Sequence, residues 1–166
     1  MDLQSFYPPQ FVPQMLKDFH AWYLATTNDP VVSGAAGLVG KPGEFAWIKS
    51  FFLLEGLFQL PTFFVALYGL WIGSARINLL ILIYAASTTT TVLACVSTVL
   101  ELPTTSELTI KAGLMSLTDV QRYMLLASYV PFMLVPAVMM VDMGLRTLRL
   151  VETATKLTKK SDPKSS

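Results

Sequence analysis

The sequence predicts an all-α integral membrane protein, a helical bundle with three membrane-spanning helices in this chain. Of the 166 residues, 53% are hydrophobic and only 14% are charged, whereas a soluble domain usually carries about 25% charged residues. The mean hydropathy is +0.54. Three apolar segments, residues 46–71, 77–100 and 120–145, each exceed the ~20 residues needed to cross ~30 Å of hydrocarbon. The net charge of +1 argues against nucleic-acid binding.

The first 45 residues are predicted to lie outside the membrane. Between residues 10 and 26, apolar side chains recur at steps of three and four residues, which is typical of an amphipathic helix. This helix could pack on the bundle or form a lid over a cavity. Asp29 and Pro30 are predicted to end it, because a residue before proline avoids the α region, and the glycine-rich residues 33–43 are predicted to form a loop. The apolar positions of the helix are Phe11, Met15, Phe19, Trp22 and Tyr23.

The charge pattern predicts the topology. Residues 72–76 form a short connection, so the first two spans should be antiparallel neighbours, and residues 101–119 form a longer one. The positive-inside rule places the basic residues 149–166 in the cytoplasm. Counting back, residues 1–45 are lumenal and residues 46–148 form the bundle. Because a lumenal start without a secretory signal needs explanation, we expect a further span before Met1, giving four spans with both ends cytoplasmic.

One carboxyl group lies well inside the first span. Glu55 is about 13 Å along a helix that begins at residue 46, and a charged carboxyl at that depth costs roughly 2.5 kcal/mol or more. Gln59 falls on the same face one turn later. Pro61 is predicted to kink the helix, since it leaves a carbonyl group without its amide partner. Intramembrane carboxyls are commonly functional, and the alternative for Glu55 is a hydrogen bond to a neighbouring helix.

The second and third spans also carry polar side chains. Residues 87–91 are five hydroxyl residues in succession, and Thr88 and Thr91 share a helical face with Tyr84. This face could line a cavity, or its hydroxyls could bond to carbonyls of their own helix. In the last span, Tyr129 and two nearby prolines predict a kink that could serve bending or ligand contact. No pair of His or Cys residues has metal-ligand spacing, so we predict no metal and no cofactor.

Short sequence elements recur in order along nearly the whole chain. They are Met1-Asp2-Leu3-Gln4, Tyr7-Pro8, Trp22-Tyr23, Asp29-Pro30, Trp47-Ile-Lys-Ser-Phe51, Glu55, Phe58-Gln-Leu-Pro61, Ile83-Tyr84, Thr90-Thr91, Ser97-Thr98 and Tyr129-Val-Pro131. Together, and with similar spacing, they resemble the sigma-2 receptor group of the EXPERA domain family. In that family the first of these elements directly follows a transmembrane helix, which agrees with the expected span before Met1.

The resemblance implies a four-helix bundle in the endoplasmic reticulum membrane, with nuclear envelope or endolysosomal membranes as alternatives. Its cavity would bind sterols and cationic amphiphilic drugs. Asp2 would face the ammonium group of a ligand, and a protonated Glu55 would donate a hydrogen bond to Asp2, because two close carboxyls in a low dielectric cannot both ionise cheaply. Tyr23, Phe51, Gln59, Thr91 and Ser128 match cavity positions of the family, and Phe132 stands where a tyrosine is usual.

The resemblance leaves two classes of function. A binding protein would hold a sterol or cationic amphiphile and act in sterol homeostasis and transport, as a homodimer or with a cholesterol-transport protein as partner. A sterol Δ8–Δ7 isomerase would use the carboxyl pair as acid and base. Isomerase relatives carry a histidine one turn before the glutamate, where this chain has Phe51, and residues 120–145 contain no tryptophan to stabilise a carbocation. We therefore predict a binding protein and no enzyme; a scaffold role, with Glu55 joining helices, is a third interpretation.

Overall fold

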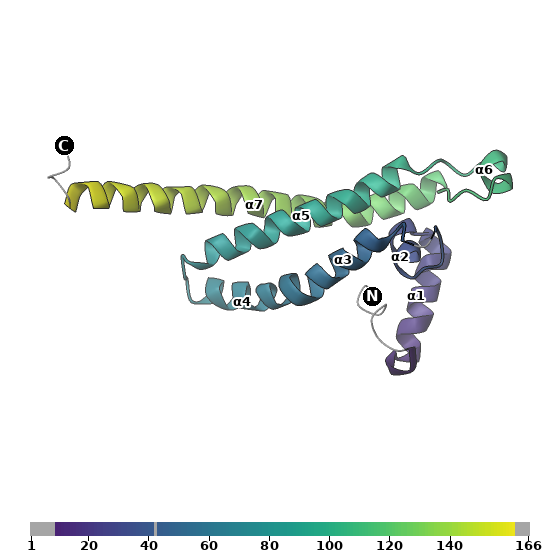
Figure 1. Cartoon of the computed structure of the whole chain (residues 1–166), viewed down its shortest axis with the longest axis horizontal. Coiled ribbons are helices and arrows are strands. Elements are labelled where there is room, and N and C mark those ends of the chain that lie inside the picture. The colour runs from purple at the N-terminus through teal and green to yellow at the C-terminus, as the bar shows by residue number, and fades with distance from the viewer. Residues whose placement is uncertain (1–8, 42, 162–166) are drawn as a thin grey trace.

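The computed structural model describes residues 9–41 and 43–161, and these residues form helices without a strand (Figure 1). Three helices are long and apolar enough to cross a membrane, as predicted. They occupy Ala46–Trp71, Ile77–Glu101 and Asp119–Lys160. In chain order the elements are η2 (Pro9–Phe11), α1 (Gln14–Thr27), α2 (Pro30–Ala35), α3 (Ala46–Leu54), η3 (Glu55–Gln59), α4 (Leu60–Trp71), α5 (Ile77–Glu101), α6 (Glu107–Lys111) and α7 (Asp119–Ser161).

The first two spans form the antiparallel hairpin that their short connection predicts (Figure 1). The turn between α4 and α5 needs Gly73, whose φ is +66°, a left-handed conformation that glycine adopts without strain. Gly69 sits where the two helices meet, and a Cβ atom there would lie 2.6 Å from the Ile77 side chain. The small residue therefore permits the close approach of α4 and α5.

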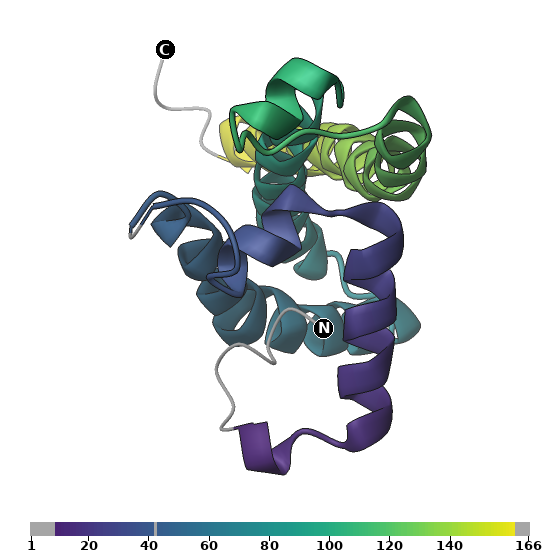
Figure 2. The ribbon, with the colours of Figure 1, turned by 90° about the vertical axis from the view of Figure 1, so that its right-hand side faces the viewer.

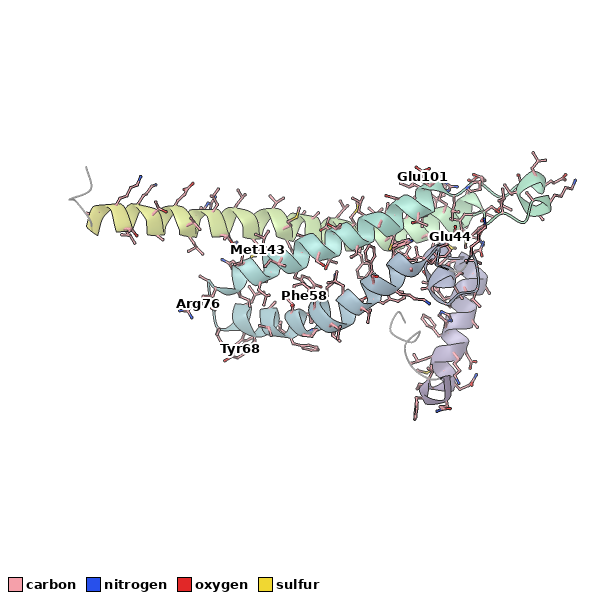
Figure 3. All side chains as sticks on the ribbon, in the orientation of Figure 1. Glu44, Phe58, Tyr68, Arg76, Glu101 and Met143 are labelled. Atoms are coloured by element: carbon pink, nitrogen blue, oxygen red, sulfur yellow. The ribbon has the colours of Figure 1, made fainter. Side chains whose placement is uncertain are left out.

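Charged side chains mark both ends of α5. Arg76 lies at the turn before it and Glu101 at its opposite end (Figure 3), while residues 77–100 carry no Asp, Glu, Lys or Arg. This arrangement is the one expected for a helix that crosses hydrocarbon with its charges in the two interfaces.

The last helix is longer than the apolar segment that predicted it. α7 has 43 residues and therefore measures roughly 65 Å, about twice the hydrocarbon thickness. It continues through the basic residues after 148 and includes Pro131 and Pro136. The two prolines that predicted a kink therefore do not break the helix.

The first span contains a π-helical turn, η3, directly before the proline that was predicted to kink it. The amide of Leu60 donates to the carbonyl of Glu55, five residues earlier, so the helix is locally wider than an α-helix. The ribbon changes direction between α3 and α4 (Figure 1). The bend at Pro61 thus takes the form of a π-bulge, which is a recognised cause of kinks.

A short helix, α2, occupies part of the stretch that was predicted to be a loop. The Asp29 side chain accepts hydrogen bonds from the amides of Val31 and Val32, and Pro30 occupies the first turn. An aspartate cap followed by proline is a strong helix start, so the expected loop at residues 33–43 begins only after Ala35. Val31 and Ala35 then pack on Ile48 and Phe52 of α3.

The amphipathic helix before Asp29 is present, but its aromatic face does not pack on the bundle. α1 begins at Gln14, after Pro13, and ends at Thr27, where Asn28 with a φ of +50° caps it. Four of the five predicted apolar positions are exposed: Phe11 by 72%, Met15 by 76%, Phe19 by 48% and Trp22 by 61%. Tyr23 is half-buried. The helix contacts the bundle through Tyr23 and Thr27, whereas the other apolar side chains lie on a neighbouring face of α1 that is exposed among the described residues.

Candidate functional site

A cavity of about 550 Å³ lies among α1, α2, the α3–η3 segment, α5 and α7. Ten of the eleven residues predicted as ligand-binding line it, although they come from five elements, α1, α3, η3, α5 and α7. The eleventh, Asp2, lies outside the described residues. The lining residues are Tyr23, Val31, Val32, Phe51, Phe52, Glu55, Gln59, Tyr84, Thr88, Thr91, Val92, Cys95, Ser128, Tyr129 and Phe132.

The π-helical turn η3 brings Glu55 and Gln59 to the cavity wall. Gln59 is buried, with 8% of its surface exposed. Its Nε2 donates to Ser87 Oγ on α5 at 3.1 Å. Gln59 therefore connects the first span to the second, and its position in the wall is held by that hydrogen bond.

One face of α5 forms the opposite part of the wall. Tyr84, Thr88, Thr91 and Cys95 follow one another at three- and four-residue steps and all line the cavity. Thr88 Oγ1 donates to the Tyr84 carbonyl at 3.0 Å, and Thr91 Oγ1 donates to the Thr88 carbonyl at 3.0 Å. The sequence analysis offered a cavity lining and hydrogen bonds to the same helix as alternatives, and both are present. The Thr88 and Thr91 side chains line the cavity, and their hydroxyl groups donate to carbonyls of α5. A hydroxyl that donates to the backbone keeps lone pairs that can accept.

A second carboxyl group, which the sequence analysis did not select as a site residue, lies behind the cavity wall. Asp29 has no exposed surface. Its Oδ2 accepts hydrogen bonds from the phenol groups of Tyr23 and Tyr129, both at 2.7 Å. Its Oδ1 accepts from the amides of Val31 at 2.8 Å and Val32 at 3.3 Å. The side chain therefore joins α1, α2 and α7 through four donors.

Only the local part of the cluster around Asp29 could have been predicted from the sequence. Asp29 followed by Pro30 is the pattern of a capped helix start, which could have predicted α2 and a buried capping carboxylate. The partnership with Tyr129, 100 residues later in the chain, has no local signature. Among the described residues, no group of three or more His, Cys, Asp or Glu side chains is placed to hold a metal ion.

The comparison with known families decides the classification. Residues 15–143 match the model of EXPERA, the expanded EBP superfamily. The chain belongs to the EXPERA superfamily. It is also 32% identical over 146 residues to Sigma intracellular receptor 2 of Xenopus tropicalis, an alignment that covers 86% of this chain and 77% of that relative. The Homo sapiens and Macaca fascicularis proteins of the same name are each 32% identical over 144 residues, covering 86% of this chain and 76% of each relative.

Proposed function

We propose that this chain is a receptor-like membrane protein that binds sterols and cationic amphiphilic molecules in the cavity between its spans. The observation that carries the proposal is the convergence of Glu55 and Gln59 with apolar and hydroxyl side chains on one cavity of about 550 Å³. Pockets that bury drug-sized ligands measure roughly 300–1,000 Å³ and combine an apolar lining with a few polar groups. The chain's own cavity has this size and this mixture.

The chemistry of the wall favours a ligand that carries a positive charge or donates hydrogen bonds. Glu55 supplies a carboxyl group, and the hydroxyl oxygens of Thr88 and Thr91 can accept because their protons bond to backbone carbonyls. Valine and phenylalanine side chains from α2, α3 and α7 provide the apolar surface that a sterol ring system would contact.

The hydrogen bonds of Asp29 indicate whether this carboxyl group is available to bind the ligand. Its two oxygens already accept from two phenols and two amides, so its charge is satisfied by the chain itself. We therefore leave Asp29 out of the ligand site and propose the pair of Asp2 and Glu55 for the ligand's ammonium group, with Asp2 as the carboxylate that faces it and Glu55 as its hydrogen-bonded partner.

The name of the relatives supports an intracellular receptor role, and the three apolar helices support a multi-pass membrane protein. We further propose that the protein resides in the endoplasmic reticulum membrane and acts in sterol homeostasis and transport. A homodimer or a cholesterol-transport protein would be its assembly partner. Binding is preferred to isomerisation because Phe51, which lines the cavity beside Glu55, cannot carry a proton.

The test is a binding titration of the protein in lipid nanodiscs with a tritiated cationic sigma-2 ligand, followed by displacement with cholesterol. We expect saturable binding that cholesterol displaces, and a loss of roughly tenfold or more in affinity for Glu55→Gln, since one carboxyl group of the proposed site is lost. The matched control is Glu101→Gln, the same change outside the cavity, which should bind as wild type. Absence of saturable binding, or equal affinity of Glu55→Gln and wild type, contradicts the proposal.

The same samples separate binding from turnover. Incubation with a Δ8 sterol and chromatography of the extracted sterols should return the substrate unchanged. Formation of a Δ7 product that Glu55→Gln abolishes would instead establish isomerisation.

A further inference from the structure

Helix α1 runs crosswise to the three long helices. Figure 1 shows it at the end of the bundle at which α3 begins and α5 ends, and Figure 2, viewed from that end, shows its length in profile. The three spans define the direction across the bilayer. A helix that lies across this direction at the end of the spans lies along the plane of the membrane surface.

The surface of α1 is divided into three faces. Tyr23 and Thr27 face the bundle and are half-buried and buried. Gln14, Lys17 and Asp18 form an exposed polar face, on which Gln14 Nε2 donates to Asp18 Oδ1 at 2.7 Å. The third face, which we call the aromatic stripe, is apolar and exposed, and it consists of Met15, Phe19 and Trp22 with Phe11 of η2.

The side chains of the aromatic stripe are of the kind that proteins usually bury, but no described residue covers them. Its members follow at steps of three and four residues, and the rings of Phe19 and Trp22 stack with centroids 5.6 Å apart. Contiguous exposed apolar patches of this kind mark sites of interaction with proteins, ligands or membranes. The position of the stripe beside the spans decides among these.

The three spans next to α1 present apolar side chains on their outer surface. Each exposes large apolar residues, including Leu53, Phe63 and Val138, as helices in hydrocarbon do. A crosswise helix at the end of those spans lies where the hydrocarbon gives way to headgroups. Tryptophan is enriched at this depth, and an amphipathic helix there buries its apolar face about 5–10 Å into the boundary.

We propose that α1 is an interfacial anchor, whose aromatic stripe inserts into the headgroup–acyl boundary of the bilayer while Lys17 and Asp18 remain in water. Trp22 and Tyr23 are consecutive, and Tyr23 bonds to Asp29 and lines the cavity. In this proposal, α1 contacts the lipid boundary through its aromatic stripe and lines the cavity through Tyr23. This inference does not depend on whether a ligand binds.

The experiment uses spin labels on single cysteines in the full chain, in phosphatidylcholine nanodiscs. Because Cys95 is the only cysteine, Cys95→Ala gives the background, in which Met15→Cys and Phe19→Cys report on the stripe and Lys17→Cys and Asp18→Cys on the polar face. We expect the ratio of collision rates with oxygen and with a water-soluble nickel chelate to be roughly tenfold higher at the stripe positions, as for a helix half immersed in lipid.

Two results would overturn the proposal. Equal access of the nickel chelate to all four positions would place α1 in water. Stripe labels shielded from both reagents would show that protein, such as a segment preceding residue 9 or a second copy, covers the stripe.

Tryptophan fluorescence provides a second measurement that needs no spin label and therefore cannot be affected by a label that disturbs α1. In Trp47→Phe/Trp71→Phe, Trp22 is the remaining tryptophan, and its fluorescence should be quenched by brominated lipid and protected from iodide. Quenching by iodide alone would contradict the interfacial position.

Discussion

Asp29 and Glu55 show two different uses of a carboxyl group in a largely apolar protein. Asp29 has no exposed surface and accepts from two phenols and two amides, so all its bonding serves the junction of α1, α2 and α7. Glu55 stands on a π-helical turn and lines a cavity. Asp29 is buried and bonded within the fold, whereas Glu55 is exposed at the cavity, and this difference assigns Asp29 to the stability of the fold and Glu55 to the proposed site.

The largest effect is expected where Asp29 is removed. Asp29→Ala leaves two phenol groups and two helix-end amides without their acceptor, and each unsatisfied buried group costs about 1–3 kcal/mol. We expect a loss of at least about 3 kcal/mol in the free energy of unfolding, seen as a lower midpoint of thermal unfolding in detergent. Asp18→Ala, on the exposed face of α1, is the control and should melt within about 0.5 kcal/mol of wild type. Similar melting of the two variants would contradict a structural role for Asp29.

A smaller effect is expected when the donors to Asp29 are removed one at a time. Tyr129→Phe and Tyr23→Phe each delete one hydrogen bond to the same oxygen, and a bond to a charged group contributes roughly 1.5–3 kcal/mol. Because both donors share Oδ2, the double variant should lose more than the sum of the two single losses, as the carboxylate then has no phenol partner. Strict additivity of the unfolding free energies would show that the two tyrosines act independently of each other, which contradicts coupling through the shared oxygen.

The smallest effect is expected at the hydrogen bond that holds Gln59. Ser87→Ala removes the acceptor of Gln59 Nε2 without changing the lining residues. Hydrogen bonds between membrane helices average about 0.6 kcal/mol, so unfolding should change by that order. Ligand affinity should fall less than for Glu55→Gln, and an equal fall would mean that the anchoring of Gln59, rather than the carboxyl of Glu55, controls the site.

Much of the fold could be predicted because it follows from local patterns. The three spans, the tight turn after Trp71 and the helical face that joins Tyr84, Thr88 and Thr91 all depend on periodicity within one segment. Pro61 predicted a bend, but not its form, since a π-bulge depends on how the carbonyl groups before the proline find new partners.

The features that could not be predicted from the sequence depend on contacts between segments that are far apart in the chain. The four donors to Asp29 come from three elements, and nothing near Asp29 in sequence indicates Tyr129. The helix before Asp29 was expected to pack on the bundle or to cover a cavity, and the apolar stripe in sequence does not distinguish a protein partner from lipid. Its exposed position, and the direction of α1 across the spans, became visible only in the folded chain.

The most direct test applies the same carboxyl-to-amide change to both groups and measures affinity and stability on each variant. Glu55→Gln should lose roughly tenfold or more in affinity for the tritiated cationic ligand, with a melting midpoint close to that of wild type. Asp29→Asn should lower the melting midpoint, because its NH₂ group replaces one of two oxygens that each accept from two donors, whichever way the amide is turned. If Glu55→Gln instead melts early, or if Asp29→Asn melts normally while losing all affinity, the assignment of fold to Asp29 and site to Glu55 is wrong.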